Sequence, residues 1–240
     1  ILSFLITFLY TPYGYFIEKG SNLRSYSLQL IYGLIFLSFF AVLINFFYPL
    51  GIYINSVFLL ISLFFLLKFK RIYFSKKYIF FCFISALIIF LLLACSNVYR
   101  PDAGLYHLPY INILNNEKII IGLSNLHFRF GHTSIIQYTS AISNNILLKE
   151  NGISFPSALI ASSVIINFFS NLNKKFKGGN FDLYFFFTIS LLVFIFYKIN
   201  RFSEYGNDAP AHLLLFLLIS EIIKNYNNYT TDKISNYFLL

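Results

Sequence analysis

Acidic, basic and histidine side chains gather between residues 97 and 132, in a chain that is 58% hydrophobic and only 11% charged. Asp102 comes soon after a long apolar run, and its carboxylate could take a proton from a hydroxyl or amine acceptor. His107, Arg129 and His132 could donate hydrogen bonds to a phosphate, a contact that charged donors favour. The plainer alternatives are that Asp102 caps a helix and that the other three are solvated loop residues.

A second polar cluster lies nearer the C-terminus, in the sequence RFSEYGNDAPAH. Arg201, Glu204 and Asp208 give it one basic and two acidic groups. Asp208 also stands where a helix N-cap belongs, with Pro210 in the first turn, so capping alone is the competing explanation. A helix that begins here offers unpaired backbone N–H groups to an anion. Two such clusters in a chain so poor in charge favour a functional site.

Metal binding is a further alternative for these acids. Asp102 with Glu204 or Asp208 could hold a hard divalent cation, Mg²⁺ or Mn²⁺, through oxygen ligands. A structural zinc site is not expected, because the histidine spacings do not place two rings on one helical face and no cysteine is near. Cys82 and Cys95 share one apolar run. A helix of ~1.5 Å per residue separates them by about 19 Å, too far for a disulfide.

The apolar runs between these clusters must position them. A mean hydropathy of +0.70 and runs near the ~20 residues that cross a ~30 Å hydrocarbon layer predict an all-α, polytopic transmembrane bundle in contact with membrane lipids. We expect one transmembrane domain over residues 1–240. Because the chain has no Met and stops within NYFLL, we expect it to be a fragment of a longer protein. The seven predicted spans are Leu2–Ile17, Leu28–Tyr48, Ile52–Leu67, Tyr78–Ser96, Ile153–Leu172, Phe181–Ile199 and Ala209–Ile223.

Lysine and arginine predict the orientation of these spans. One set of loops, which includes KFKRIYFSKK and NKKFKGG, carries twelve basic residues, and the other set carries six. The positive-inside rule places the richer set in the cytoplasm. Residues 97–152 then form a long external loop, and the RFSEYGND loop emerges on the same side. The net charge of +9 mostly reflects this asymmetry, so no nucleic-acid partner is needed to explain it.

The external loop is predicted to carry amphipathic helices. Ser134 and Gln137 fit the capping-box pattern S-x-x-Q, and apolar residues then recur at three- and four-residue spacing. This segment is expected to lie at the membrane surface. The stretch DAGLYHLPYINIL predicts a second short helix, with Asp102 as its N-cap and Pro109 as a kink.

The order of these features resembles the GT-C superfamily of membrane glycosyltransferases. The resemblance rests on a span that leads into VYRPDAGLYHLPYI, on the loop NLHFRFGHTSIIQY, and on an acid-bearing loop two spans later. It covers about Tyr78 to Ile223, while three spans precede the family's first helix. It implies an enzyme of the bacterial inner membrane and cell envelope that takes sugars from polyprenyl-phosphate donors. Asp102 would match the family's first-loop acid, and Glu204 or Asp208 the second.

By this resemblance, Asp102 would activate the acceptor, and Arg129, Arg201 and the histidines would neutralise the departing phosphate. Three other classes compete. A transporter or flippase would favour ionisable residues within the spans, and here only Glu221 comes close to that pattern. An O-antigen ligase or polymerase would also act on lipid-linked glycans. In a non-catalytic membrane scaffold, the polar loop would be incidental.

Overall fold

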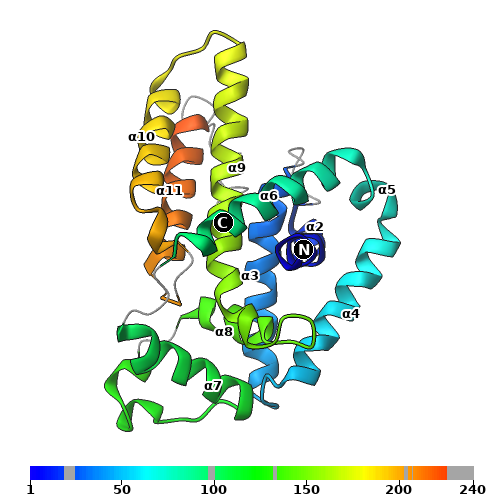
Figure 1. The fold of residues 1–240 in the computed structure, drawn as a ribbon, viewed down its shortest axis with the longest axis vertical. Coiled ribbons are helices and arrows are strands. Elements are labelled where there is room, and N and C mark those ends of the chain that lie inside the picture. Colours follow the sequence, from blue (N-terminus) through cyan, green and yellow to red (C-terminus); the bar gives the residue numbers. More distant parts are fainter. Residues whose placement is uncertain (19–24, 97–100, 132–133, 203–204, 207, 226–240) are drawn as a thin grey trace, which may run out of the picture.

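The computed structural model describes residues 1–18, 25–96, 101–131, 134–202, 205–206 and 208–225 (Figure 1). These residues form helices and no strand, which confirms the all-α prediction. The longer helices are α3 (Tyr26–Asn45), α4 (Ile52–Lys68), α6 (Lys76–Ala94), α9 (Phe155–Lys177), α10 (Leu183–Tyr197) and α11 (Asp208–Asn225). The shorter elements are α1 (Leu2–Tyr10), η1 (Thr11–Gly14), α2 (Tyr15–Glu18), α5 (Lys70–Tyr73), η2 (Ala103–His107), α7 (Leu108–Asn116), η3 (Leu123–Asn125), η4 (Phe128–Gly131), α8 (Ile135–Ser143), η5 (Lys149–Ser154) and η6 (Ile199–Arg201).

Three helices in the described part of the chain are long and apolar enough to cross a membrane: Tyr26–Asn45, Lys76–Ala94 and the continuous segment Lys149–Lys177. Ile52–Lys68 and Leu183–Tyr197 are apolar but shorter. The first predicted span is interrupted, because Pro12 lies in the 3-10 turn η1 between α1 and α2. Proline removes a backbone donor and clashes with the preceding turn, so an uninterrupted α-helix is disfavoured there.

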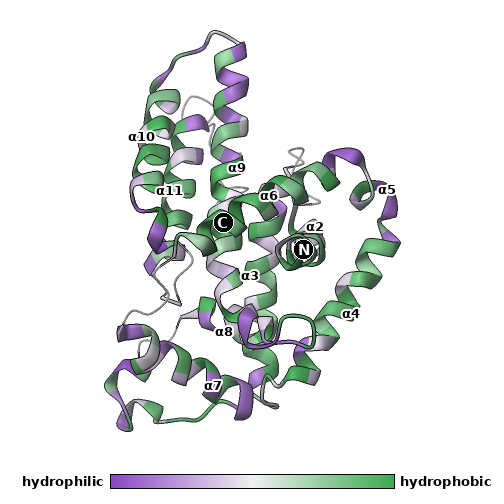
Figure 2. Ribbon diagram, in the orientation of Figure 1, coloured by the Kyte–Doolittle hydropathy of each residue, from purple (hydrophilic) through white to green (hydrophobic). Residues whose placement is uncertain are grey.

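Hydrophobic residues dominate these helices (Figure 2), and many of their large apolar side chains are exposed. Phe64 on α4, Phe80 on α6 and Phe186 on α10 are each more than half exposed. Soluble monomers rarely expose apolar patches of large extent, whereas lipid tails solvate them without cost. The exposed phenyl rings therefore indicate a surface that contacts the hydrocarbon chains of lipids.

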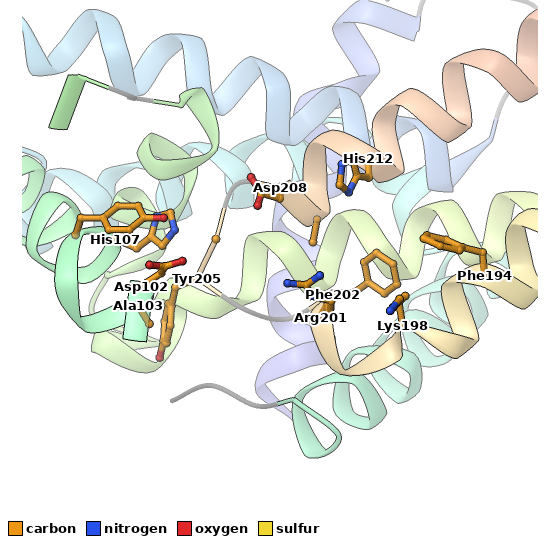
Figure 3. A pocket seen from close by; sticks show the side chains of 13 residues that line it. Asp102, Ala103, His107, Phe194, Lys198, Arg201, Phe202, Tyr205, Asp208 and His212 are labelled. Carbon is orange, nitrogen blue, oxygen red and sulfur yellow. The ribbon is translucent and has the colours of Figure 1, made fainter. Parts of the chain in front are cut away.

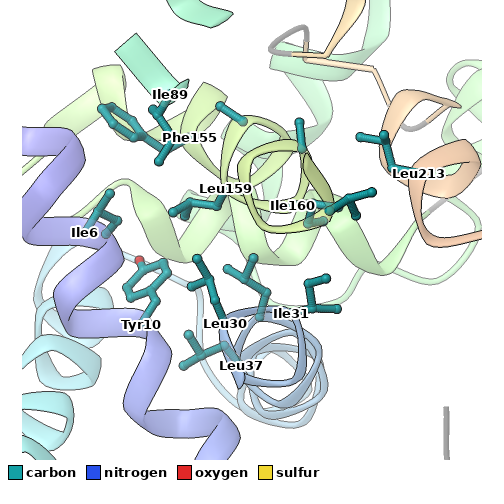
Figure 4. Packing of buried hydrophobic residues seen from close by; sticks show 14 of the residues in the cluster. Ile6, Tyr10, Leu30, Ile31, Leu37, Ile89, Phe155, Leu159, Ile160 and Leu213 are labelled. Carbon is teal, nitrogen blue, oxygen red and sulfur yellow. The ribbon is translucent and has the colours of Figure 1, made fainter. Parts of the chain in front are cut away.

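Helices α3 and α9 run together through the middle of the molecule (Figure 1). Helices α6, α10 and α11 pack against α9, while η1 and α8 pack against α3. Leu30 and Leu37 of α3 meet Leu159 and Ile160 of α9 in the buried cluster of Figure 4. The contact of η1 with α3 depends on Gly14, because a Cβ atom there would lie 1.9 Å from the carbonyl oxygen of Gln29.

Hydroxyl groups link the helices inside this core. Thr7 Oγ1 of α1 lies 3.4 Å from Ser85 Oγ of α6, which lies 3.0 Å from Ser162 Oγ of α9. All three side chains are fully buried. Small polar residues of this kind let helix backbones approach closely in membranes and bond across the interface.

The segment that contains α8 is held in place by side-chain amides from distant helices. Asn55 Nδ2 of α4 donates to the carbonyl oxygens of Ala141 and Asn144, at 2.9 and 2.7 Å. Asn115 Nδ2 of α7 donates to the same Ala141 oxygen at 3.0 Å, and to that of Leu50 at 2.8 Å. These bonds add side-chain donors to the carbonyls of Ala141 and Asn144 at the C-terminal end of α8, where a helix runs out of backbone N–H partners. We call this set the amide clamp.

Helix α8 begins with the predicted capping box. Ser134 Oγ accepts from the N–H of Ile136 at 3.4 Å, and Gln137 Oε1 accepts from the N–H of Ser134 at 3.0 Å. Every residue from Gln137 to Ser143 is buried. Packing against α3, α4, α7 and α9 therefore covers the polar face of α8 as well as its apolar face. An amphipathic pattern does not distinguish this environment from a lipid surface.

Candidate functional site

One pocket brings the two polar clusters together (Figure 3). It has a volume of about 190 Å³ and lies where η2 approaches the turn between α10 and α11. Its lining residues are Asp102, Ala103, Tyr106, His107, Phe194, Lys198, Arg201, Phe202, Tyr205, Gly206, Asp208, Ala209 and His212. The volume is below the ~300–1,000 Å³ of sites for drug-sized ligands, so it suits a small polar group.

Asp102 reaches this pocket from the start of an irregular helix. Residues Ala103–His107 form a π turn, in which the N–H of Leu108 donates to the carbonyl of Ala103, five residues back. Pro109 gives a physical reason, because it has no N–H for the carbonyl of Leu105 and its ring crowds that carbonyl. The predicted kink is thus a widened turn just before the proline. Isolated π turns are frequent at functional sites.

The side chain of Asp102 does not act as the predicted cap. Its backbone is helical, and its carboxylate makes no capping hydrogen bond. The carboxylate is exposed and lies near the hydroxyl of Tyr106 in the same turn. Partial burial raises the pKa of Tyr106, and the negative charges of Asp102 and Asp208 raise it further. Tyr106 therefore keeps its proton at neutral pH and can donate it in a hydrogen bond.

Arg129 lies beside the pocket, where its guanidinium contacts the ring of Tyr106. The centre of its guanidinium lies 5.1 Å from the centroid of the Tyr106 ring and 5.3 Å from that of Phe128. Both distances are within the range of a cation–π contact. Arg129 itself is exposed and belongs to η4. It adds a positive charge beside the pocket without lining it.

The facing wall comes from the end of α10, from η6 and from the start of α11. Lys198 follows α10 and Arg201 ends η6, so both cations point from one short turn. Asp208 is the first residue of α11, where the helix dipole favours a negative charge. His212 lies one turn further along α11, so it shares a face with Asp208.

Charge is unevenly arranged within the pocket. Figure 3 shows Asp102 and His107 at one end, Lys198 and Phe194 at the other, and Asp208, Arg201 and His212 between them. Neither Asp102 nor Asp208 forms an ion pair with any residue that the structure describes. Among the described residues neither carboxylate is thus neutralised by a cation, and Asp102 has the hydroxyl of Tyr106 as a hydrogen-bond partner.

His107 is the buried member among the ionisable side chains that line the pocket, with 6% of its surface exposed. Its Nδ1 lies 3.4 Å from Gln137 Nε2 of α8. Burial lowers the pKa of His107, and Arg129 acts in the same direction, while Asp102 and Asp208 oppose them. The net effect favours a neutral imidazole at pH 7.

The structure thus gathers four of the predicted site residues, Asp102, His107, Arg201 and Asp208, in one pocket. Arg129 lies beside them, while His132 and Glu204 fall outside the described residues. Sequence reasoning missed Tyr106, Lys198, Tyr205 and His212. The spacing of four between Asp208 and His212 could have revealed the latter, because it predicts one shared helical face.

The described residues do not make a metal site. No group of three His, Cys, Asp or Glu side chains within them is arranged to hold an ion. The predicted ligand set of Asp102, Asp208 and Glu204 includes one residue outside the described part.

A second cluster of charges lies at the opposite ends of α10 and α11. Lys175 Nζ is 2.5 Å from Asp182 Oδ2, and Lys224 Nζ is 3.0 Å from Glu221 Oε1. The ring of Tyr184 lies between the two lysines, whose Nζ atoms are 5.9 and 6.0 Å from its centroid. Each acid in this cluster is matched by a lysine. We call it the paired cluster.

Helices of this length and hydropathy, with phenyl rings on their outer surface, indicate an all-helical membrane protein. The whole chain, residues 1–240, matches the model of the family described as domain of unknown function DUF8201, and it belongs to that family. No curated protein and no solved structure matches it.

Proposed function

We propose that this protein is a membrane glycosyltransferase of the GT-C type. It would transfer a sugar from a polyprenyl-phosphate donor to an acceptor at the external face of the bacterial inner membrane. In this proposal the chain crosses the membrane seven times, at the seven apolar segments predicted from the sequence. The supporting observation is that one pocket has the Asp102 carboxylate at one end, the Lys198 cation at the other, and Asp208 and Arg201 between them.

Each end of the pocket suits one part of the reaction. Asp102 would accept the proton of the acceptor hydroxyl as its oxygen bonds to the sugar's anomeric carbon. The bond between that carbon and the phosphate oxygen breaks at the same centre. Polyprenyl phosphate then leaves with its negative charge beside Arg201 and Lys198. Asp208 lies between the two ends, where it can orient sugar hydroxyls.

The size of the pocket fits a donor whose sugar phosphate binds inside it and whose lipid chain stays outside. A volume of about 190 Å³ suits a sugar phosphate head and excludes the long polyprenyl chain. Phe194, which lines the cationic end, belongs to α10, whose outer surface exposes Phe186 and Val193. The lipid chain would lie along such apolar helix faces, next to the phosphate.

Transport is less well supported. A transporter would use ionisable groups inside its spans, and Asp182 and Glu221 are the two acids that the sequence places within predicted spans. Asp182 is paired with Lys175 at the start of its span. In the structure Glu221 is paired with Lys224. That pairing accounts for its charge without a transported ion.

The decisive experiment is a transfer assay with the purified protein in lipid nanodiscs. A polyprenyl-phosphate donor with a radiolabelled sugar is incubated with the protein and with delipidated envelope extract as acceptor. We expect release of free polyprenyl phosphate and a labelled product, both dependent on the protein. A donor that stays chemically intact, while label crosses sealed proteoliposomes, would instead identify a flippase.

Topology has a separate test. Ser124 and Lys77 are exposed in the structure and lie in the loops predicted to be external and cytoplasmic. Each is changed to cysteine after Cys82 and Cys95 have been replaced by serine. In intact cells, a membrane-impermeant thiol reagent should label Ser124→Cys and leave Lys77→Cys unlabelled until the membrane is permeabilised. The reverse pattern would place the pocket on the cytoplasmic side and end the proposal.

A further inference from the structure

Gln137 connects the cap of α8 to the pocket. Its Oε1 accepts from the backbone N–H of Ser134 at 3.0 Å, as the third residue of a capping box does. Since only the amide oxygen can accept that bond, the other end of the amide must be the NH₂ group. That NH₂ nitrogen lies 3.4 Å from His107 Nδ1. The capping box therefore fixes which face of the amide the imidazole meets.

An amide NH₂ group can donate a hydrogen bond and cannot accept one. His107 Nδ1 must then act as the acceptor, which leaves the ring proton on Nε2. A doubly protonated ring would turn an N–H toward the NH₂ group of Gln137 in a site where His107 is 6% exposed. The contact thus selects the neutral ring and one of its two tautomers.

The other ring nitrogen of His107, Nε2, lies toward the pocket. A Cβ atom built on Gly206 would lie 3.6 Å from His107 Nε2, and Gly206 lines the pocket wall that faces η2. The charged groups around the ring are Asp102 and Asp208, which favour protonation, and Arg129, which opposes it. Tyr106 adds a ring contact at 4.1 Å between centroids. Two carboxylates would make this histidine a cation if nothing opposed them.

We propose that Gln137 is a positioning residue that holds His107 as the neutral tautomer with its proton on Nε2. The pocket then presents a fixed, uncharged hydrogen-bond donor to an acceptor oxygen of its ligand, such as a sugar hydroxyl or a phosphoryl oxygen. The phosphate charge falls to Arg201 and Lys198. The ligand's identity rests on the proposed function, whereas the tautomer does not.

The test exchanges the donor for an acceptor while keeping the cap. Glutamate serves in a capping box as well as glutamine does, so Gln137→Glu retains the bond to the Ser134 N–H. Its carboxylate can only accept, so His107 must turn an Nδ1–H toward it and gains a negative neighbour. Proton–nitrogen correlation spectra of ¹⁵N-histidine-labelled protein in detergent micelles report the protonation of each ring nitrogen. The His107→Gln variant identifies the His107 signals.

In the wild type we expect an unprotonated Nδ1, a protonated Nε2 and a titration midpoint below 6.5. In Gln137→Glu we expect a protonated Nδ1 and a higher midpoint. Ser134→Ala weakens the same cap without touching the amide, and it should leave the His107 spectrum unchanged. Should Gln137→Glu not fold, Gln137→Met removes donor and acceptor together and should populate both tautomers.

A wild-type ring protonated on Nδ1 would overturn the proposal, and so would equal midpoints in the wild type and Gln137→Glu. A Ser134→Ala spectrum that matches Gln137→Glu would overturn it too, because the effect would then be that of a weakened helix. The measurement needs no substrate. Failure of the transfer assay therefore leaves this result standing, and the reverse also holds.

Discussion

The two ends of helices α10 and α11 carry similar side chains in opposite arrangements. In the paired cluster, Asp182 and Glu221 each contact a lysine, and the lysines also cover the ring of Tyr184. In the pocket, Asp102 and Asp208 form no ion pair with described residues, although Lys198 and Arg201 line the same cavity. The Lys175–Asp182 pair joins the end of α9 to the start of α10, and the Lys224–Glu221 pair lies within α11. Acids that are not paired with a cation remain able to bind a ligand. The presence of charged residues alone does not distinguish the pocket from the paired cluster.

The largest contrast should appear in transfer activity. Asp102→Asn keeps the size of the side chain and removes its ability to accept a proton. We expect transfer to fall by about 10²- to 10⁴-fold, the usual contribution of general acid–base help. Asp182→Asn is the matched change in the paired cluster and should alter transfer less than twofold. Equal losses in the two variants, at matched expression in nanodiscs, would remove the distinction between the two ends.

Donor affinity should show the next largest difference. Arg201→Gln removes a cation from the pocket, and a hydrogen bond to a charged group is worth about 1.5–3 kcal/mol. The KM for the polyprenyl-phosphate donor should therefore rise roughly 10- to 100-fold. Lys224→Gln removes one charge from the paired cluster, and its KM should stay at the wild-type value. A KM unchanged by Arg201→Gln would place the phosphate elsewhere.

Stability should reverse the ranking of the two ends. Asp182 Oδ1 accepts from the N–H of Phe185 at 3.1 Å, so Asp182 is a true cap of α10, whereas Asp102 caps nothing. Asp182→Ala should therefore cost about 1 kcal/mol. Asp102→Ala should stay within about 0.5 kcal/mol of the wild type. Denaturation in detergent, followed by circular dichroism, measures both, and a larger loss for Asp102→Ala would contradict the structure.

The smallest effect is the pH dependence that His107 gives to stability. Because its pKa in the folded protein lies below the ordinary 6.5, the unfolded chain binds more protons than the folded one between the two values. The free energy of unfolding should be highest above pH 6.5 and fall as the pH drops below it. His107→Gln should lose this part of the dependence, measured as the thermal midpoint between pH 7.5 and 5.5. An identical slope in His107→Gln would assign the effect to other groups.

Some of this architecture follows from local sequence alone. The apolar runs gave the positions of the main helices, and the S-x-x-Q pattern gave the start of α8, because length and capping depend on neighbours in the chain. The interruption at Pro12 was visible in the sequence, yet the predicted span Leu2–Ile17 ran through it. Hydropathy averaged over many residues does not register that one of them, Pro12, lacks a backbone N–H.

Other features depend on long-range contacts and could not be predicted. The burial of α8 on both faces requires α3, α4, α7 and α9 around it, and α3 and α4 are distant in the sequence. In the sequence Lys198 is an ordinary residue at a span end, and the structure places it in the lining of the same pocket as Asp102. Conversely, His127 belongs to the polar stretch, but its ring packs against Phe128 and Phe130, and its Nδ1 accepts from the backbone N–H of Arg129. Which charged groups meet is decided by the packing of helices.

The amide clamp has a consequence for how a ligand would be captured. Amide groups of Asn55 and Asn115 fix the carbonyl end of α8, whose first turn holds Gln137 against His107. Helix α8 is therefore already ordered in the folded protein, so its conformational entropy is lost on folding and not on ligand binding. A ligand that arrives does not have to order this wall, so none of its interaction energy is consumed in doing so. Its residence time is then set by the contacts it makes.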